Sequence, residues 1–278
     1  MKKLEAMALV VCLCLLASCA EPREDAGPAE AGPPAVYGFD PMTAEERFVA
    51  EDGQELAYYR YELQTMTVEN REELSPETLE AAERNVESFN ARMTELLDQR
   101  VASGRQLAET AEMVYDAGGS LSEAYYDELT SSVFLRGQIC SVRVDTSQYA
   151  GGAHEFSYTS GFVLDLGTGK IIDPTQVADD PEAFRTGAVA PLVERADALE
   201  ENVPGYLPDY RETISLWYER AVVFGDQGMT VIFPTYDLGP YAMGPVELTV
   251  PYGDLSELLG PGGLARLGLD TEQADIDG

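Results

Sequence analysis

Histidine is almost absent from this chain of 278 residues, in which His154 is the only one. A zinc site held by several histidines is therefore excluded, and a Ser-His-Asp triad would have to use His154. The chain has no Cys-x-x-Cys pair and no Gly-x-Ser-x-Gly nucleophile elbow. The segment 167–170 lacks the flanking residues of a phosphate-binding loop. We therefore predict no metal, no cofactor and no catalytic residue.

Cysteine is also scarce, and three of the four lie within the first 19 residues. Two lysines precede a stretch of apolar residues, 7–16, that is too short to span a bilayer. The stretch ends in Leu-Ala-Ser-Cys19, and small residues before a cysteine resemble the lipobox of bacterial lipoproteins. We expect residues 1–18 to be a signal peptide and Cys19 to carry lipid. An ordinary signal peptide with incidental cysteines is the alternative.

This reading predicts an extracytoplasmic protein that is anchored by lipid to the cell membrane, or to an outer membrane if the cell has one. Cys140 is then the last unmodified cysteine, so the fold has no internal disulfide. It lies in an apolar run, residues 133–144, and we expect a buried strand residue there rather than a reactive thiol.

Positive charge is scarce too: the chain has 18 Lys and Arg residues but 50 Asp and Glu residues. The formal net charge of −32 repels nucleic acid and anionic lipid headgroups, and it attracts cations and basic proteins. A general solvation strategy, as in salt-adapted proteins, explains the same composition. The charge therefore excludes nucleic acid as a partner without naming another.

Composition divides the rest of the chain. Residues 19–44 are expected to be the lipid anchor and a disordered linker rich in Pro, Glu, Ala and Gly, and residues 258–278 an acidic tail. Residues 45–132 are expected to form a helix-containing subdomain and residues 133–257 a hairpin-rich one.

Periodicity predicts an α+β fold with an antiparallel sheet and packed helices. Alternation predicts a strand over residues 55–68, and Ser75-Pro76 begins a helix with a break at Gly104 and a shorter helical stretch to Tyr115. Further helices are expected at residues 181–200 and 208–218, and strands at residues 133–144, 158–166, 170–172, 220–224, 229–233 and 246–250.

Two loops carry the candidate ligand-binding residues. The first is Tyr-Ala-Gly-Gly-Ala-His at residues 149–154, and the second is Tyr-Asp-Leu-Gly-Pro-Tyr-Ala-Met-Gly-Pro at residues 236–245. Paired glycines let the backbone approach a neighbour closely, and tyrosines offer a large contact area with few rotors to freeze. The alternative roles are conformational for the glycines, packing for the tyrosines and a ring-to-backbone hydrogen bond for the histidine. The candidates in these loops are Tyr149, Gly151, Gly152, His154, Tyr236 and Tyr241, and Tyr252, directly after the strand expected at residues 246–250, is added to them.

Together with the hairpin at residues 165–170, these motifs resemble the RsiV-type extracytoplasmic domain over about residues 45–257. That domain occurs in the lysozyme-sensing anti-sigma factor RsiV, beside the catalytic domain of the peptidoglycan deacetylase PdaC, and alone in many lipoproteins. The resemblance implies a binding protein of the cell envelope whose partner is lysozyme, another basic protein or a peptidoglycan fragment. The alternatives are a hydrolase that modifies cell-wall glycan with His154 as general base, and a structural envelope protein without a ligand.

Overall fold

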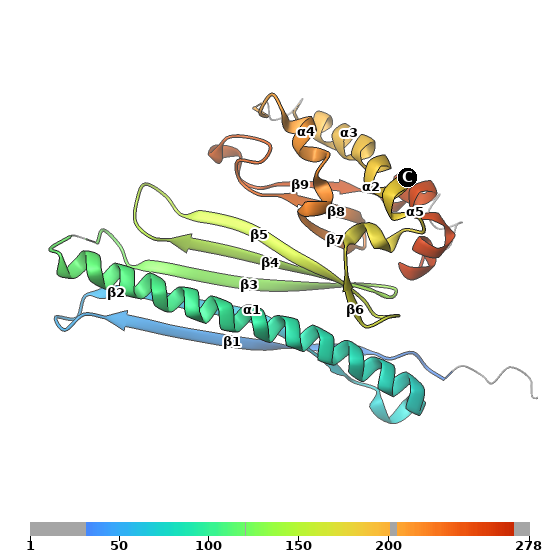
Figure 1. The fold of residues 1–278 in the computed structure, drawn as a ribbon, viewed down its shortest axis with the longest axis horizontal. Coiled ribbons are helices and arrows are strands. Elements are labelled where there is room, and N and C mark those ends of the chain that lie inside the picture. The colour runs from blue at the N-terminus through green and yellow to red at the C-terminus, as the bar shows by residue number, and fades with distance from the viewer. Residues whose placement is uncertain (1–31, 120, 201–204, 270–278) are drawn as a thin grey trace, which may run out of the picture. The chain divides into compact units, whose positions relative to one another are not determined.

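The computed structural model describes residues 32–119, 121–200 and 205–269. The expected signal peptide, Cys19 and the end of the expected tail lie outside these ranges. Residues from Pro33 onward belong to one compact unit, and within its described part the predicted α+β fold is confirmed (Figure 1). Its strands are β1 Tyr37–Val49, β2 Glu55–Val68, β3 Tyr125–Arg136, β4 Ile139–Tyr149, β5 Phe156–Asp165, β6 Lys170–Ile172, β7 Ala221–Gly225, β8 Gly228–Phe233 and β9 Val246–Val250. Its helices are α1 Pro76–Asp116, α2 Pro181–Gly187, α3 Val189–Glu200, α4 Tyr210–Ile214 and α5 Tyr252–Arg266, with 3₁₀ turns η1 Arg71–Glu73, η2 Pro174–Val177, η3 Trp217–Glu219 and η4 Tyr241–Met243.

The first six strands form one sheet in chain order, β1 to β6. Neighbours are antiparallel except β2 and β3, which run parallel. Parallel neighbours need a long crossover, and α1 supplies it between them. The helix begins where the sequence predicts, with the Ser75 hydroxyl accepting a hydrogen bond from the Thr78 amide.

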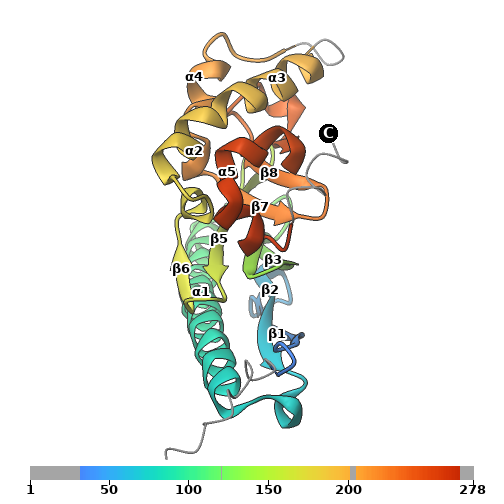
Figure 2. The same ribbon diagram turned by 90° about the vertical axis from the view of Figure 1, so that its right-hand side faces the viewer.

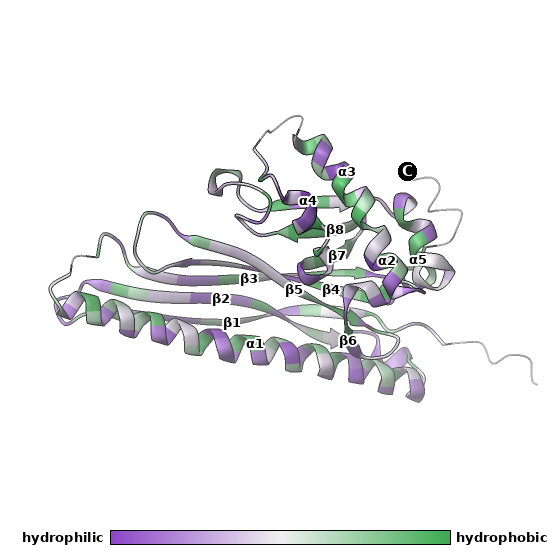
Figure 3. Cartoon of the chain, turned by 45° about the horizontal axis from the view of Figure 1, so that its top comes forward, coloured by the Kyte–Doolittle hydropathy of each residue, from purple (hydrophilic) through white to green (hydrophobic). Residues whose placement is uncertain are grey.

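Helix α1 packs its apolar stripe on one face of this sheet. Phe89 and Met93 are fully buried against Tyr61 and Leu63 of β2. Figure 3 shows the alternation of hydrophilic and hydrophobic residues along the helix. A repeat of apolar residues at helical spacing predicts which face of a helix is buried, and this pattern is the clearest structural signal in the sequence. No helix of the described ranges is both long enough and apolar enough to cross a membrane.

The predicted helix break at Gly104 is wrong, because α1 continues through it to Asp116. A side chain at this position would meet the sheet: a Cβ atom on Gly104 would lie 2.6 Å from Tyr59 Cδ1 and 2.6 Å from the Tyr61 hydroxyl. The glycine therefore allows helix and sheet to approach closely instead of ending the helix.

Strands β7, β8 and β9 form a second, antiparallel sheet, which lies over the other face of the first (Figures 1 and 2). Alternate residues of this small sheet point to opposite sides. Val223 and Ile232 pack with Phe134 of β3, whereas Val222 and Val231 belong to the core shared with α2 to α5. Burial on both faces explains why β7 and β8 are nearly continuous apolar runs, whereas the edge strand β9 alternates and exposes Glu247.

Three predicted boundaries need correction. The linker ends before residue 44, because residues 37–44 pair with β2 as part of β1. The division between residues 132 and 133 cuts through β3, whereas the six-stranded sheet continues to Ile172. The tail begins later than residue 258, because α5 continues to Arg266 and Leu259, Leu264 and Leu267 are buried in the core.

Candidate functional site

The β4–β5 loop, residues 150–155, is shaped by its two glycines. Gly151 and Gly152 have φ angles of +84° and +112°, which other residues adopt only with strain. A Cβ atom on Gly151 would lie 2.7 Å from the Tyr125 hydroxyl. The Tyr149 hydroxyl donates a hydrogen bond to the carbonyl oxygen of Gly152 at 3.2 Å. The predicted glycine and tyrosine of this motif thus fix the path of the loop.

The β8–β9 loop, residues 234–245, is held by polar and apolar anchors. Arg220 Nε donates to Asp237 Oδ2 at 2.5 Å, and Leu238 is fully buried. Tyr236 has a φ angle of +75°, and it is the only non-glycine residue with positive φ in the described ranges. A bulky residue in that region is strained, and such strain often accompanies a functional surface.

The two loops meet, although their motifs are more than 80 residues apart in sequence. The His154 ring stacks on the Tyr241 ring with a centroid distance of 4.1 Å and an interplanar angle of 19°. The Tyr236 and Tyr241 rings lie 5.8 Å apart, and the Tyr241 hydroxyl donates to the Glu155 carbonyl oxygen at 3.4 Å. All three of these aromatic side chains are exposed. The structure therefore joins both predicted segments in one surface, which we name the motif-loop surface: His154, Tyr236 and Tyr241.

Glu155 connects this surface to the face of the six-stranded sheet that lies opposite α1. Its Oε2 atom accepts hydrogen bonds from the Tyr126 hydroxyl at 2.5 Å and from Ser147 Oγ at 2.8 Å. These bonds, that of Tyr126 first, lower the pKa of the Glu155 carboxyl. Burial, followed by the bond to Glu155, raises the pKa of Tyr126 to about 12. Glu155 is therefore an exposed carboxylate in a fixed orientation.

Tyr126 is the middle of a row of three tyrosines that crosses the sheet. The centroid of the Tyr126 ring lies 5.7 Å from that of Tyr58 and 5.9 Å from that of Tyr149, and both pairs are stacked. Sequence reasoning missed Tyr126 and Glu155, because their partners come from β2, β4 and the β4–β5 loop. The available signal was strand alternation together with the position of Glu155 directly after His154.

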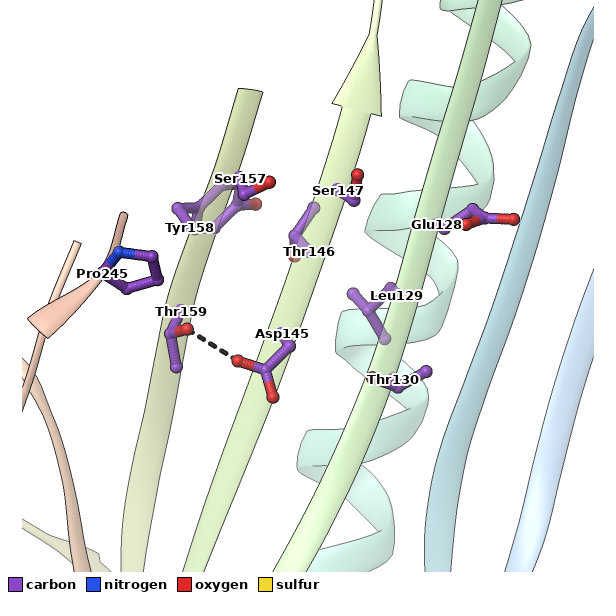
Figure 4. Close-up of a pocket in the computed structure, with 10 residues that line it drawn as sticks. All are labelled: Glu128, Leu129, Thr130, Asp145, Thr146, Ser147, Ser157, Tyr158, Thr159 and Pro245. Carbon is purple, nitrogen blue, oxygen red and sulfur yellow. Dashed lines mark hydrogen bonds between the residues drawn. The ribbon is translucent and has the colours of Figure 1, made fainter. Parts of the chain in front are cut away.

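A cleft of about 260 Å³ lies beside these residues, between the open ends of β3, β4 and β5 and the residue before β9 (Figure 4). Most of the residues that line it carry a hydroxyl or a carboxylate, although the larger part of its surface is apolar. The Thr159 hydroxyl donates to Asp145 Oδ1 at 2.6 Å, and Pro245 forms the opposite side. In the described ranges, no group of three His, Cys, Asp or Glu residues is placed to hold a metal ion.

The remaining predicted residues lie elsewhere or serve the fold. Tyr252 begins α5 and is 4% exposed, and its hydroxyl donates to the Gly225 carbonyl oxygen at 2.8 Å. It packs in the core and does not reach the motif-loop surface. His154 Nδ1 lies 3.3 Å from the Glu155 carbonyl oxygen, in keeping with the ring-to-backbone contact considered from the sequence. Cys140 is fully buried, as predicted, and burial raises the pKa of its thiol to about 12.

The architecture defines an α+β protein in which a helix-covered sheet is overlaid by a smaller sheet with its own helices. Residues 209–253 match the model of a family described as "Protein of unknown function (DUF3298)". The matched segment includes the β8–β9 loop with Tyr236 and Tyr241, but not the β4–β5 loop with His154.

Solved structures of DUF3298 proteins share the fold. The chain is 18% identical to a family member from Bacteroides fragilis NCTC 9343, with a TM-score of 0.57 over 84% of this chain and 97% of that one. It is 17% identical to a DUF3298 protein from Pseudomonas aeruginosa PAO1, with a TM-score of 0.52 over 82% of this chain and 96% of that one. No curated protein matches the chain. At these identities the likeness establishes the fold alone.

Proposed function

We propose that this chain is an extracytoplasmic binding protein, anchored through lipid on Cys19, that captures a basic protein on its motif-loop surface. The observation that carries the proposal is the stacking of His154 on Tyr241, which brings the two sequence motifs into one exposed aromatic group. Aromatic residues that are held rigidly on a surface give large contact area at little entropic cost, which suits recognition of a protein.

The contacts of His154 favour binding over catalysis. A general base needs a partner that orients its ring and a nearby acid or nucleophile. In the described ranges, the hydrogen bond of the His154 ring is to a backbone carbonyl, and its main contact is the stacked Tyr241 ring. That arrangement positions a flat contact surface.

Charge supports a basic protein as the ligand, and the resemblance to the RsiV-type domain makes lysozyme the first candidate. A chain with a formal net charge of −32 attracts a basic protein over several ångströms and raises the rate of encounter. The range of this attraction is the Debye length, which falls from about 30 Å at 0.01 M salt to about 10 Å at 0.1 M.

Calorimetry of the full chain with hen egg-white lysozyme tests the proposal. We expect saturable binding at 0.01 M salt and a weaker association at 0.1 M salt, because screening shortens the attraction. Absence of heat from binding at 0.01 M salt would remove lysozyme as the ligand. Release of sugars or acetate from purified peptidoglycan, lost in His154→Ala, would replace the binding role by an enzymatic one.

A peptidoglycan fragment is the second candidate, and the cleft of Figure 4 is the observation that favours it. Its serine and threonine hydroxyls and its carboxylates offer hydrogen bonds to sugar hydroxyls, and its volume of about 260 Å³ is near the small end of ligand pockets. Co-sedimentation of the full chain with purified peptidoglycan distinguishes this candidate. Retention that Thr159→Val abolishes and Tyr241→Ala leaves unchanged would favour glycan over protein.

A further inference from the structure

On the side of the six-stranded sheet opposite α1, strands β1, β2 and β3 carry an arginine–tyrosine–carboxylate unit. The Cζ atoms of Arg47 and Arg60 lie 5.6 and 6.0 Å from the centroid of the Tyr58 ring. Each arginine also pairs with a carboxylate, Arg47 with Glu55 at 3.2 Å and Arg60 with Glu128 at 3.4 Å. A cation near an aromatic face and beside a carboxylate gains both cation–π and ionic attraction.

A tyrosine ring and a carboxylate also lie together one strand further along, on β3 and in the β4–β5 loop. In the described ranges, no arginine pairs with this carboxylate. The Tyr126 ring stacks on Tyr58, and its hydroxyl holds the Glu155 carboxylate. The Glu155 carboxylate accepts hydrogen bonds from the hydroxyls of Tyr126, Ser147 and Ser157, and within the described part of the chain no salt bridge joins it to a basic side chain. Glu155 is exposed, so its free oxygen positions face solvent.

The other carboxylates around the cleft are already paired. Asp145 accepts two hydrogen bonds from Arg143 Nε, at 2.9 and 2.7 Å, and Glu128 pairs with Arg60. A cation from outside would have to displace these internal arginines at Asp145 or Glu128, but not at Glu155. The position of Glu155 beside the motif-loop surface also places it within reach of any partner that covers Tyr241, whose hydroxyl contacts the Glu155 carbonyl.

We propose that Glu155, held by the Tyr126 and Ser147 hydroxyls beside the motif-loop surface, forms a subsite for an arginine side chain of the protein ligand. The inference rests on the proposed function and names the group that the ligand must present. Arginine fits better than lysine, because a planar guanidinium bonds a carboxylate through two N–H groups at once, whereas the ammonium of lysine is a point charge. Tyr126 and Ser147 hold the carboxylate in place, so little conformational freedom is lost on binding.

The single histidine provides a local probe. In the full chain without a histidine tag, the ring signals of His154 in an NMR spectrum have one source, one residue away from Glu155. We would titrate the chain with a capped Gly-Arg repeat peptide and with the matching Gly-Lys peptide. The wild type should show saturable shifts of the His154 signals with the arginine peptide and weaker binding of the lysine peptide. Equal affinity for the two peptides would overturn the assignment of arginine.

Two isosteric variants separate the subsite from the overall charge. Glu155→Gln removes the carboxylate, and Glu87→Gln removes an exposed charge from α1, on the opposite side of the sheet. We expect Glu155→Gln to lower the affinity for the arginine peptide and for lysozyme by about tenfold, which is the effect of one well-placed charged contact. Glu87→Gln should bind both with the affinity of the wild type. Unchanged His154 signals without ligand would show that the loop is intact in both variants.

The outcomes distinguish this inference from the proposed function. If lysozyme binds the wild type and both variants equally, the proposed function stands and the arginine subsite falls. The arginine peptide could instead lose affinity only in Glu155→Gln while lysozyme does not bind the wild type. That result would support the subsite and exclude lysozyme as the ligand. Equal loss of affinity in both variants would assign the attraction to net charge and overturn the subsite.

Discussion

At the scale of single residues, Glu155 shows how a surface carboxylate acquires a defined orientation. Its Oε2 atom accepts bonds from Tyr126 and Ser147, and Ser157 is within 3.4 Å of its other oxygen. Each hydroxyl stabilises the charged form of the carboxyl and not the protonated form, so the carboxylate persists at more acidic pH than a free side chain. A binding site built on Glu155 therefore keeps its negative charge throughout the neutral range.

The pKa of Glu155 is the observable of this arrangement. Tyr126→Phe removes the largest cause of the lowered pKa, so we expect the Glu155 pKa to rise towards its usual range. A pH titration of its side-chain carbon signal by NMR gives the measurement. Because the folded-state pKa is lowered, the charge and any binding that depends on it are lost as pH falls through that value. Tyr37→Phe serves as the control, because Tyr37 begins β1 opposite the last residue of β2 and its hydroxyl contacts Asn85. An equal shift in both variants would contradict the assignment.

A second residue-scale feature is the buried charge under α1. Asp127 is fully buried, and it pairs with Arg100 and accepts a hydrogen bond from the Tyr61 hydroxyl at 2.7 Å. Burial raises the pKa of the Asp127 carboxyl, and the Tyr61 and Arg100 contacts act in the opposite direction. The pair joins the middle of the helix to β2 and β3.

Breaking this pair from one side should be costly. Asp127→Ala leaves Arg100 without its partner, so we expect the free energy of unfolding to fall by about 3–5 kcal/mol. Chemical denaturation measures the change. The double variant Arg100→Met with Asp127→Leu removes both charges, and it should recover a large part of the loss. If the double variant is as unstable as the sum of the single ones, the loss does not come from an unpaired buried charge.

At the scale of elements, Gly104 decides between two opposing effects. Helix propensity alone predicts that Gly104→Ala stabilises α1 by up to about 1 kcal/mol. The new Cβ atom would meet Tyr59 and Tyr61 at 2.6 Å, and overpacking of that kind costs about 1–3 kcal/mol. We therefore expect a net loss of stability in denaturant titration. As the control, Ser103→Ala at the exposed neighbouring position should change stability by less than about 0.5 kcal/mol. An increase in stability of Gly104→Ala would contradict the expectation and show that Tyr59 and Tyr61 move to accommodate the new Cβ atom.

The elements with strong local patterns were predictable from sequence. The alternation of β2, the cap at Ser75 and the turn after Asp165 each depend on neighbours within a few residues. The missed elements depend on distant ones. Strand β1 contains Pro41 and several charged residues, and it is a strand because it pairs with β2 along its length. Helix α5 includes Pro261, and its leucines gain their stability in the core of the second sheet.

The candidate site was predictable only where local sequence motifs mark its residues. Motif chemistry singled out His154, Tyr236 and Tyr241, and the structure brings their side chains together. Tyr252 belongs to the same motif region but faces the core, since its hydroxyl bonds the end of β7. Sequence distance does not reveal which tyrosine of a loop faces outward, because this depends on the element packed behind it. The contributions of Tyr126 and Glu155 needed the register of β3 and β4.

At the scale of the whole molecule, the central question is where the protein is held. Residues 1–31 lie outside the described part, so the lipid anchor remains a proposal from the sequence. Cys19→Ser should move the protein from the membrane fraction to the soluble fraction and abolish labelling with a radioactive fatty acid. Cys140→Ser provides the control, because this thiol is buried in β4 and is not an anchor. Labelling that persists in Cys19→Ser would rule out lipid on that cysteine.

The central claim about this protein is that the loops carrying His154 and Tyr241 act together as a ligand surface. Calorimetry with hen egg-white lysozyme at 0.01 M salt tests it most directly, using the wild type, His154→Ala, Tyr241→Ala, the double variant and Glu87→Gln as control. We expect each loop variant to lose about tenfold or more in affinity and the double variant to lose less than the product of the two, because stacked residues are coupled. Affinity equal to that of the wild type in Tyr241→Ala and His154→Ala would contradict the claim.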